Sequence, residues 1–149
     1  MSDMQTDPGF TTELNFGRTF EDLIRFSFGD SAEMADELLD AVLAGEKTAT
    51  TWAGAFGRMG GKVGRLFVIQ DSQGRDRALV EVTEFVERRF DAMDDAAFAR
   101  SEGEGDRSLA HWREVHEAFF KRQGVYAPDM PIWCCSFKLI REIPLEVSQ

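Results

Sequence analysis

A lysine and a threonine three positions apart, Lys47 and Thr50, are the pair in this sequence best suited to covalent chemistry. A lysine amine that burial keeps partly neutral can take the proton of a hydroxyl, which then attacks an acyl carbon. Residues i and i+3 share a face of a helical turn but point to opposite faces of a straight strand, so cooperation requires the chain to turn after Gly45. The alternative interpretation is a surface lysine beside strand-forming threonines.

Three carboxylates, Glu102, Glu104 and Asp106, alternate with glycines just before an expected helix. Asp106 or Ser108 is expected to cap that helix, because a side-chain oxygen there can accept a free backbone N–H. Glu102 lies too far upstream to act as a cap. A calcium loop does not fit, because no glutamate follows Glu102 or Glu104 at the twelfth loop position.

The histidines and cysteines do not predict a metal site. His111 and His116 are about 140° apart on a helix and cannot chelate one ion together. We expect His116 to be a hydrogen-bonded, half-buried structural residue. Cys134 and Cys135 are adjacent, so they lack zinc-site spacing, and on a strand they point to opposite faces, which disfavours a disulfide.

Helical and strand patterns are interspersed without a regular alternation, which favours an α+β fold. The patterns predict helices over residues 31–45, 93–100 and 108–122. They predict strands over 65–70, 77–90 and 131–143, the first two joined as a hairpin at 72–75. A glycine-dense loop over 54–64 is expected to be mobile or to lie close to a ligand.

The length of 149 residues predicts a single domain, over residues 11–149. Residues 1–10 are polar and are expected to form a flexible N-terminal tail. The net charge of −10 argues against a protein that holds duplex DNA or long RNA by counterion release, and a small ligand fits better. The sequence shows neither an apolar run long enough for a membrane span nor signal-peptide features. We therefore expect a cytoplasmic protein without membrane contact.

Together these motifs resemble the ASCH-domain family over about Phe26 to Leu139. The resemblance is carried by Gly45-x-Lys47-Thr48-Ala49-Thr50, the strand Val80-Glu81-Val82, the block Glu102-Gly103-Glu104-Gly105-Asp106 followed by Trp112 and His116, and the closing Cys135-x-Phe137. It implies a PUA-like fold, in which a small β-barrel is flanked by helices and a cleft suits RNA or a nucleoside.

Some small bacterial members of that family are amidohydrolases that deacylate N(4)-acetylcytidine and related N-acylated cytosines with a Thr, Lys and Glu triad. By motif, the triad corresponds to Thr50, Lys47 and Glu102. Where those enzymes continue with an apolar residue and arginine, this chain has Thr51-Trp52. The resemblance implies a metal-independent hydrolase without a cofactor, acting on a nucleoside. The candidate substrate-binding residues are Thr48, Trp52, Glu81, Glu104 and Trp112.

Two other functions remain open from the sequence. The cleft could hold a nucleotide or RNA without chemistry, or Lys47 could serve a ribonuclease. An RNA binder should show a continuous basic rim built from Arg58, Lys62, Arg65, Arg75 and Arg88. The sequence also leaves three points open. These are whether Thr50 or a water is the nucleophile, which acyl group is preferred, and which oligomer forms.

Overall fold

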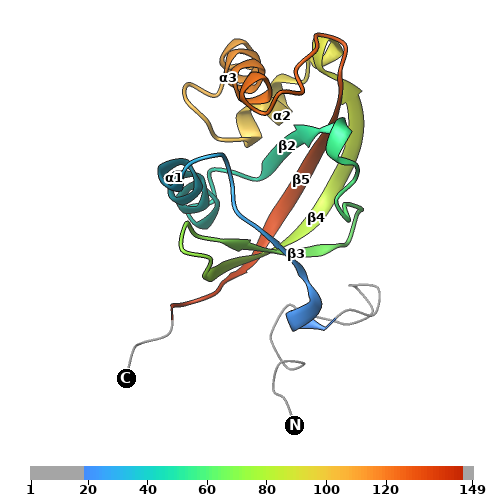
Figure 1. The fold of residues 1–149 in the computed structure, drawn as a ribbon. Coiled ribbons are helices and arrows are strands. Elements are labelled where there is room, and N and C mark those ends of the chain that lie inside the picture. Colours follow the sequence, from blue (N-terminus) through green and yellow to red (C-terminus); the bar gives the residue numbers. More distant parts are fainter. Residues whose placement is uncertain (1–18, 146–149) are drawn as a thin grey trace.

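The computed structural model describes residues 19–145, which form a curled five-stranded half-barrel with three α-helices (Figure 1). In chain order the elements are β1 (Ile24–Phe26), α1 (Ala32–Leu43), β2 (Ala49–Ala53), β3 (Leu66–Gln70), β4 (Asp76–Arg89), α2 (Ala96–Ser101), α3 (Leu109–Arg122) and β5 (Pro131–Glu142). The predicted α+β, PUA-like architecture is confirmed. The tail predicted over residues 1–10 lies outside the described residues.

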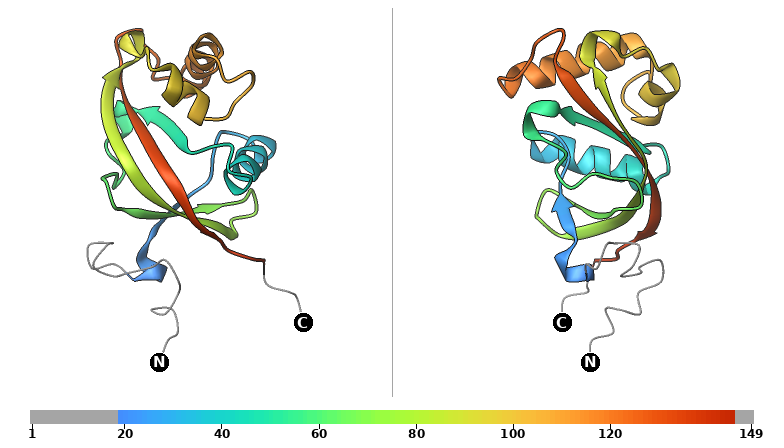
Figure 2. Two further views of the ribbon diagram at one scale, coloured as in Figure 1. Left: turned by 180° about the vertical axis from the view of Figure 1, so that it is seen from behind. Right: turned by 90° about the vertical axis from the view of Figure 1, so that its right-hand side faces the viewer.

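The strands follow the order β1-β3-β4-β5-β2, with β1 parallel to β3 and every other pair antiparallel. The long strands β4 and β5 run through the middle of the sheet. Their pairing shifts register twice, between Leu79 and Val80 and between Val82 and Glu84. Such bulges bend a strand and increase its twist, which accounts for the curl visible in Figures 1 and 2.

The two faces of the sheet pack against different helices. α1 lies against the concave face, while α2 and α3 lie together over one end of the sheet (Figure 2). The cluster under α1 includes Phe28, Leu39, Val42, Phe67, Val80, Val82, Cys135 and Phe137. The cluster under α2 and α3 includes Ala49, Ala53, Phe98, Trp112, Phe120, Ile132 and Cys134. Cys134 and Cys135 are free and lie in different clusters, as strand alternation predicted.

The predicted helices form, with one shortened. Ser31 caps α1 by accepting from the Met34 N–H, and Ser108 caps α3 by accepting from the His111 N–H. The helix expected from residue 93 begins only at Ala96, because Asp95 is its N-cap. The strands β1 and β2 were not among the predicted strands, because β1 acquires strand geometry only by pairing with β3, and β2 only by pairing with the distant β5. No helix among residues 19–145 has the length and apolarity that a membrane crossing requires.

Candidate active site

The turn that ends α1 directs the Lys47 side chain into the interior of the protein. Gly45 adopts a left-handed conformation with φ of +79°, and the Gly45 and Glu46 N–H groups donate back to Val42 and Ala41 carbonyls. This pattern is a Schellman motif, which stops a helix and redirects the chain. The Lys47 side chain enters the protein and is 1% exposed. The chain turns at Gly45, but Thr50 lies in the strand β2, so this turn alone does not place Thr50 beside Lys47.

Glu102 is the C-cap residue of α2, and its side chain lies beside Lys47. The Thr48 N–H donates to the Ser101 carbonyl at 2.7 Å, which ties the two chain segments together. Gly103 takes a φ of +72°, and a Cβ there would meet the Glu46 carbonyl oxygen. Only glycine fits this close approach, which brings the Glu102 side chain, 1% exposed, against Lys47.

The Lys47 ammonium donates to three acceptors. Nζ lies 2.7 Å from the Ala49 carbonyl oxygen, 3.2 Å from the Glu102 carbonyl oxygen and 3.2 Å from Glu102 Oε1. Three acceptors match the three N–H bonds of an ammonium, so the resting geometry is that of a charged lysine. The ammonium also lies 5.0 Å from the centre of the Phe28 ring.

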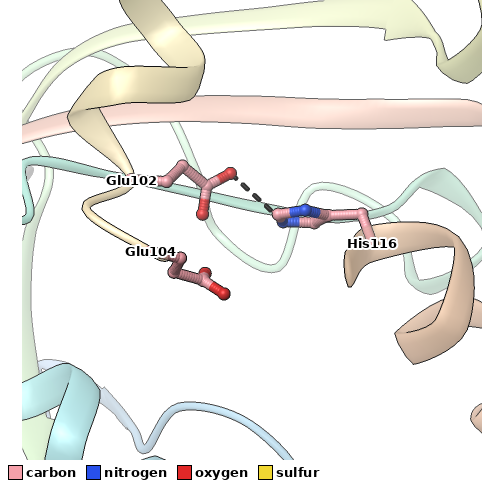
Figure 3. A group of neighbouring side chains, drawn as sticks. All are labelled: Glu102, Glu104 and His116. Carbon is pink, nitrogen blue, oxygen red and sulfur yellow. Dashed lines mark ion pairs between the residues drawn. The ribbon is translucent and has the colours of Figure 1, made fainter. Parts of the chain in front are cut away.

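Three side chains contact the second carboxylate oxygen of Glu102, Oε2. Thr51 Oγ1 donates to Oε2 at 2.5 Å, and the Trp112 indole N–H donates at 2.8 Å. His116 Nε2 lies 3.3 Å from the same oxygen (Figure 3). Burial alone would raise the pKa of Glu102, but the charges of His116 and Lys47 outweigh it and hold that pKa well below its usual range.

The contacts of His116 match those of a protonated ring. Nδ1 lies 2.8 Å from the Trp112 carbonyl oxygen, which can only accept, so Nδ1 carries a hydrogen. A neutral ring would then turn the Nε2 lone pair towards the Glu102 carboxylate, whereas an imidazolium donates to it. Burial lowers the pKa of His116, but the Glu102 charge and hydrogen bond, with the Glu104 charge, outweigh it and raise that pKa.

We predict that His116 stays protonated above its ordinary pKa of 6.5 in the folded protein. Because the folded pKa is raised, the stabilisation is fully present below pH 6.5 and is lost as the pH rises through the folded value. NMR titration of the imidazole nitrogens and pH-dependent urea unfolding measure both effects. His116→Gln should abolish this slope, whereas His111→Gln should retain it; a His116 that titrates at or below 6.5 contradicts the prediction.

Thr50 and Thr51 point to opposite sides of β2. Thr50 pairs with Cys135 and Thr51 with Cys134, and the side chains of β2 alternate between half-buried and buried. Thr51 is 7% exposed and contacts Glu102, while Thr50 shares the face of Trp52 and Cys135. Among the hydrogen bonds of residues 19–145, none joins the Thr50 side chain to Lys47 or Glu102. The assignment of Thr50 as nucleophile stays a prediction.

A cavity of about 560 Å³ opens beside this cluster. Lys47, Thr50, Thr51, Glu102 and His116 all contribute to its wall. Most of the remaining wall is apolar: Ile24, Phe26, Phe28, Met34, Leu38, Trp52, Phe56, Met59, Phe67, Val80, Val82, Val115, Phe119, Cys135 and Phe137. Burial raises the pKa of the Cys135 thiol to about 12, so at neutral pH this thiol is not a competing nucleophile.

The structure brings two of the candidate substrate-binding residues to the cavity. Glu104 lines it, with Oε2 at 3.9 Å from Lys47 Nζ, and Trp52 lines it with its indole N–H donating to the Gly57 carbonyl at 2.9 Å. Thr48 is exposed and Glu81 is half-buried, and both lie outside the lining; Glu81 lies 3.8 Å from Lys138. Trp112 lies behind the wall, where it holds Glu102.

Sequence analysis missed the roles of Thr51 and His116. The signal for Thr51 was its place next to Thr50 on a strand, where one of two successive side chains must face the core. The signal for His116 was its position four residues after Trp112, since residues i and i+4 share a helix face. The two rings stack at 4.2 Å and both contact Glu102, which shows that His116 belongs to the polar cluster and not only to the core.

Glu102, Glu104 and His116 also offer three potential metal ligands, whose atoms lie within 4.8 Å of one another (Figure 3). The Lys47 ammonium lies 3.2 Å from Glu102 and 3.9 Å from Glu104, and already places a positive charge against both carboxylates. A divalent ion would have to approach against that charge. The residues present therefore fit an ion-pair network better than a metal centre.

Comparison with known proteins finds relatives of this chain. The family model for the ASCH domain matches residues 24–141. The crystal structure of an ASCH domain from Lactobacillus crispatus matches with a TM-score of 0.71 and 30% identity over 79% of both chains. A crystal structure of a protein from Enterococcus faecalis matches with a TM-score of 0.70 and 29% identity over 80% of this chain and 76% of its own. No curated protein matches. The family match includes every residue of the cluster around Glu102.

Proposed function

The chain belongs to the ASCH-domain family, and on this premise we propose that it is an amidohydrolase of N(4)-acylated cytosine nucleosides such as N(4)-acetylcytidine. One observation carries the proposal: a buried Lys47–Glu102 ion pair opens onto a largely apolar cavity whose wall includes Thr50. A buried ion pair is a costly way to stabilise a fold, and perturbed ionisable groups at a cavity are typical of catalytic sites.

The chemistry requires Lys47 as a neutral amine. After its ammonium has released a proton to water, Nζ can act as a base, and Glu102 Oε1, 3.2 Å away, holds it in place. This amine takes the proton of Thr50 Oγ1, and the oxygen attacks the acyl carbon. When the C–N bond breaks, the proton on Nζ passes to the departing N4 of cytosine. Water then cleaves the acyl-threonine ester by the same route, releasing the carboxylic acid.

Thr51, Trp112 and His116 keep Glu102 oriented during these steps. Their contacts occupy Oε2, so Oε1 is left to accept from Lys47 and hold it in place. In the variant of the mechanism in which a water replaces Thr50 as nucleophile, Lys47 takes the proton of that water and the same contacts apply.

The surface charges support a small substrate over a long RNA. Of the expected basic rim, Arg75 binds Asp71 at 2.8 Å and Arg88 binds Asp95 at 3.3 Å. Arg65 is buried, at 9% exposed. Arg58, Lys62 and Arg75 are exposed, but Arg75 is neutralised by Asp71 and Arg65 is buried, so these five residues do not form a continuous basic rim.

Incubating the wild type, Lys47→Ala and Thr50→Ala with N(4)-acetylcytidine, and separately with labelled RNA, tests the proposal. We expect metal-independent acetate release by the wild type and its loss in both variants. Lys121→Ala is the control, because that side chain is 58% exposed and pairs with Glu117. RNA retention without turnover would instead indicate a binding module, and metal-free RNA cleavage a ribonuclease.

A further inference from the structure

Glu104 presents a carboxylate to the cavity that no protein group satisfies. Its side chain is 22% exposed, lines the cavity and lies beside Glu102 and His116 (Figure 3). Among residues 19–145, none donates a hydrogen bond to this carboxylate, and the Lys47 ammonium, 3.9 Å from Oε2, is too far away to do so. Glu102, in contrast, accepts hydrogen bonds at both of its oxygens. The Glu104 carboxylate is therefore left to accept a hydrogen bond from a molecule in the cavity.

The backbone on both sides of Glu104 is packed against other segments. Gly103 and Gly105 both have a positive φ, of +72° and +57°. A Cβ at Gly103 would meet the Glu46 carbonyl oxygen. A Cβ at Gly105 would meet the His111 ring. These two close approaches fix the position from which the Glu104 side chain reaches the cavity.

The distance between Lys47 and Glu104 matches the geometry of an amide nitrogen. The N–H bond of an amide lies in the amide plane, whereas the electron pair that nitrogen uses to accept a proton is perpendicular to that plane. Two hydrogen bonds of about 2.9 Å at a right angle separate their outer atoms by about 4.1 Å. Lys47 Nζ and Glu104 Oε2 are 3.9 Å apart. One amide nitrogen can therefore donate its hydrogen to Glu104 while its electron pair faces Lys47.

We infer that Glu104 accepts a hydrogen bond from the N4–H of the acylated cytosine, and that the enzyme selects secondary amides, whose nitrogen carries one hydrogen. This inference rests on the proposed function and adds the substrate class to it. When the C–N bond of the tetrahedral intermediate breaks, its electron pair goes to N4, which takes a proton from Lys47 Nζ. The contact with Glu104 holds N4 against Nζ for this transfer. A tertiary amide has no N–H and would place a carbon atom against the carboxylate.

Two substrates that differ by one methyl group on N4 test the inference: N(4)-acetylcytidine and N(4)-acetyl-N(4)-methylcytidine. For the wild type, we expect kcat/KM to be at least about tenfold higher for the first, because the second cannot donate to the charged acceptor. In Glu104→Ala, the small side chain leaves room for the methyl group and offers no acceptor, so the ratio of the two kcat/KM values should fall to about one. If Glu104 acted only through the charge of Lys47, its loss would lower both values alike and keep the ratio.

Glu104→Gln and Glu117→Ala are the matched variants. Glu104→Gln keeps an acceptor oxygen without the charge, and its ratio should stay above that of Glu104→Ala. Glu117 is 41% exposed, pairs with Lys121 and lies outside the cavity lining, so Glu117→Ala should keep the wild-type ratio. Circular dichroism checks that each variant is folded.

The role of Glu104 and the proposed function fail in different ways. Suppose that the wild type hydrolyses N(4)-acetylcytidine. A wild-type ratio of about one, the same ratio in Glu104→Ala as in the wild type, or equal ratios in Glu104→Ala and Glu104→Gln would then overturn the role of Glu104, as would a folded Glu104→Ala that is inactive on both substrates. The proposed function would stand in each of these cases. Hydrolysis of neither substrate by the wild type overturns both.

Discussion

Replacing Lys47 with methionine is expected to abolish acyl hydrolysis and to lower the free energy of unfolding by about 3 to 5 kcal/mol. Methionine fills similar space but leaves Glu102, which is 1% exposed, without the ammonium at 3.2 Å. Removing one member of a buried ion pair leaves the other charge uncompensated, which costs more than the pair itself contributes. Urea unfolding measures the stability and acetate release measures the activity.

A double variant separates the two effects. In Lys47→Met with Glu102→Gln, the charge that lost its partner is also removed, so much of the stability should return while activity stays absent. Lys121→Met, at an exposed lysine paired with Glu117, should change the free energy of unfolding by less than about 1 kcal/mol. A single Lys47→Met variant as stable as the wild type would show that Glu102 is not ionised in this site.

Replacing each of the two neighbouring threonines with valine is expected to give opposite results. Thr50→Val should reduce acyl hydrolysis by at least about 10³-fold with little change in stability, because it removes the proposed nucleophile from a half-buried position. Thr51→Val should lower the free energy of unfolding by about 1 to 3 kcal/mol, because Glu102 Oε2 loses the hydroxyl donor at 2.5 Å. Steady-state kinetics and urea unfolding on the same preparations measure both.

Serine at each position is the matched control. Thr50→Ser keeps a hydroxyl and should retain activity, and Thr51→Ser should recover most of the stability lost in Thr51→Val. Near-normal activity in Thr50→Val would transfer the nucleophile to a water held by Lys47. Normal stability in Thr51→Val would show that Trp112, His116 and Lys47 suffice to hold the Glu102 carboxylate.

Local patterns were enough to predict the main elements. Ser31, Gly45 and Ser108 act on backbone groups within a few residues of themselves, so the ends they predicted for α1 and α3 agree with the structure. The hairpin of β3 and β4 also follows from neighbouring residues. The strands β1 and β2 were not predicted because β1 depends on a partner about 40 positions away and β2 on a partner about 80 positions away.

The sequence by itself determined that Lys47 follows a helix stop, that a carboxylate block precedes a capped helix, and that successive residues of a strand face opposite ways. Only the tertiary structure decided that Thr51 rather than Thr50 contacts Glu102, and that His116 Nε2 lies 3.3 Å from the same carboxylate. The reason is the separation of the interacting residues along the chain. Caps and strand alternation act through adjacent backbone groups, whereas the charge of a buried residue depends on partners up to 55 positions away. Those partners meet only when α1, α2 and α3 have packed around the curled sheet.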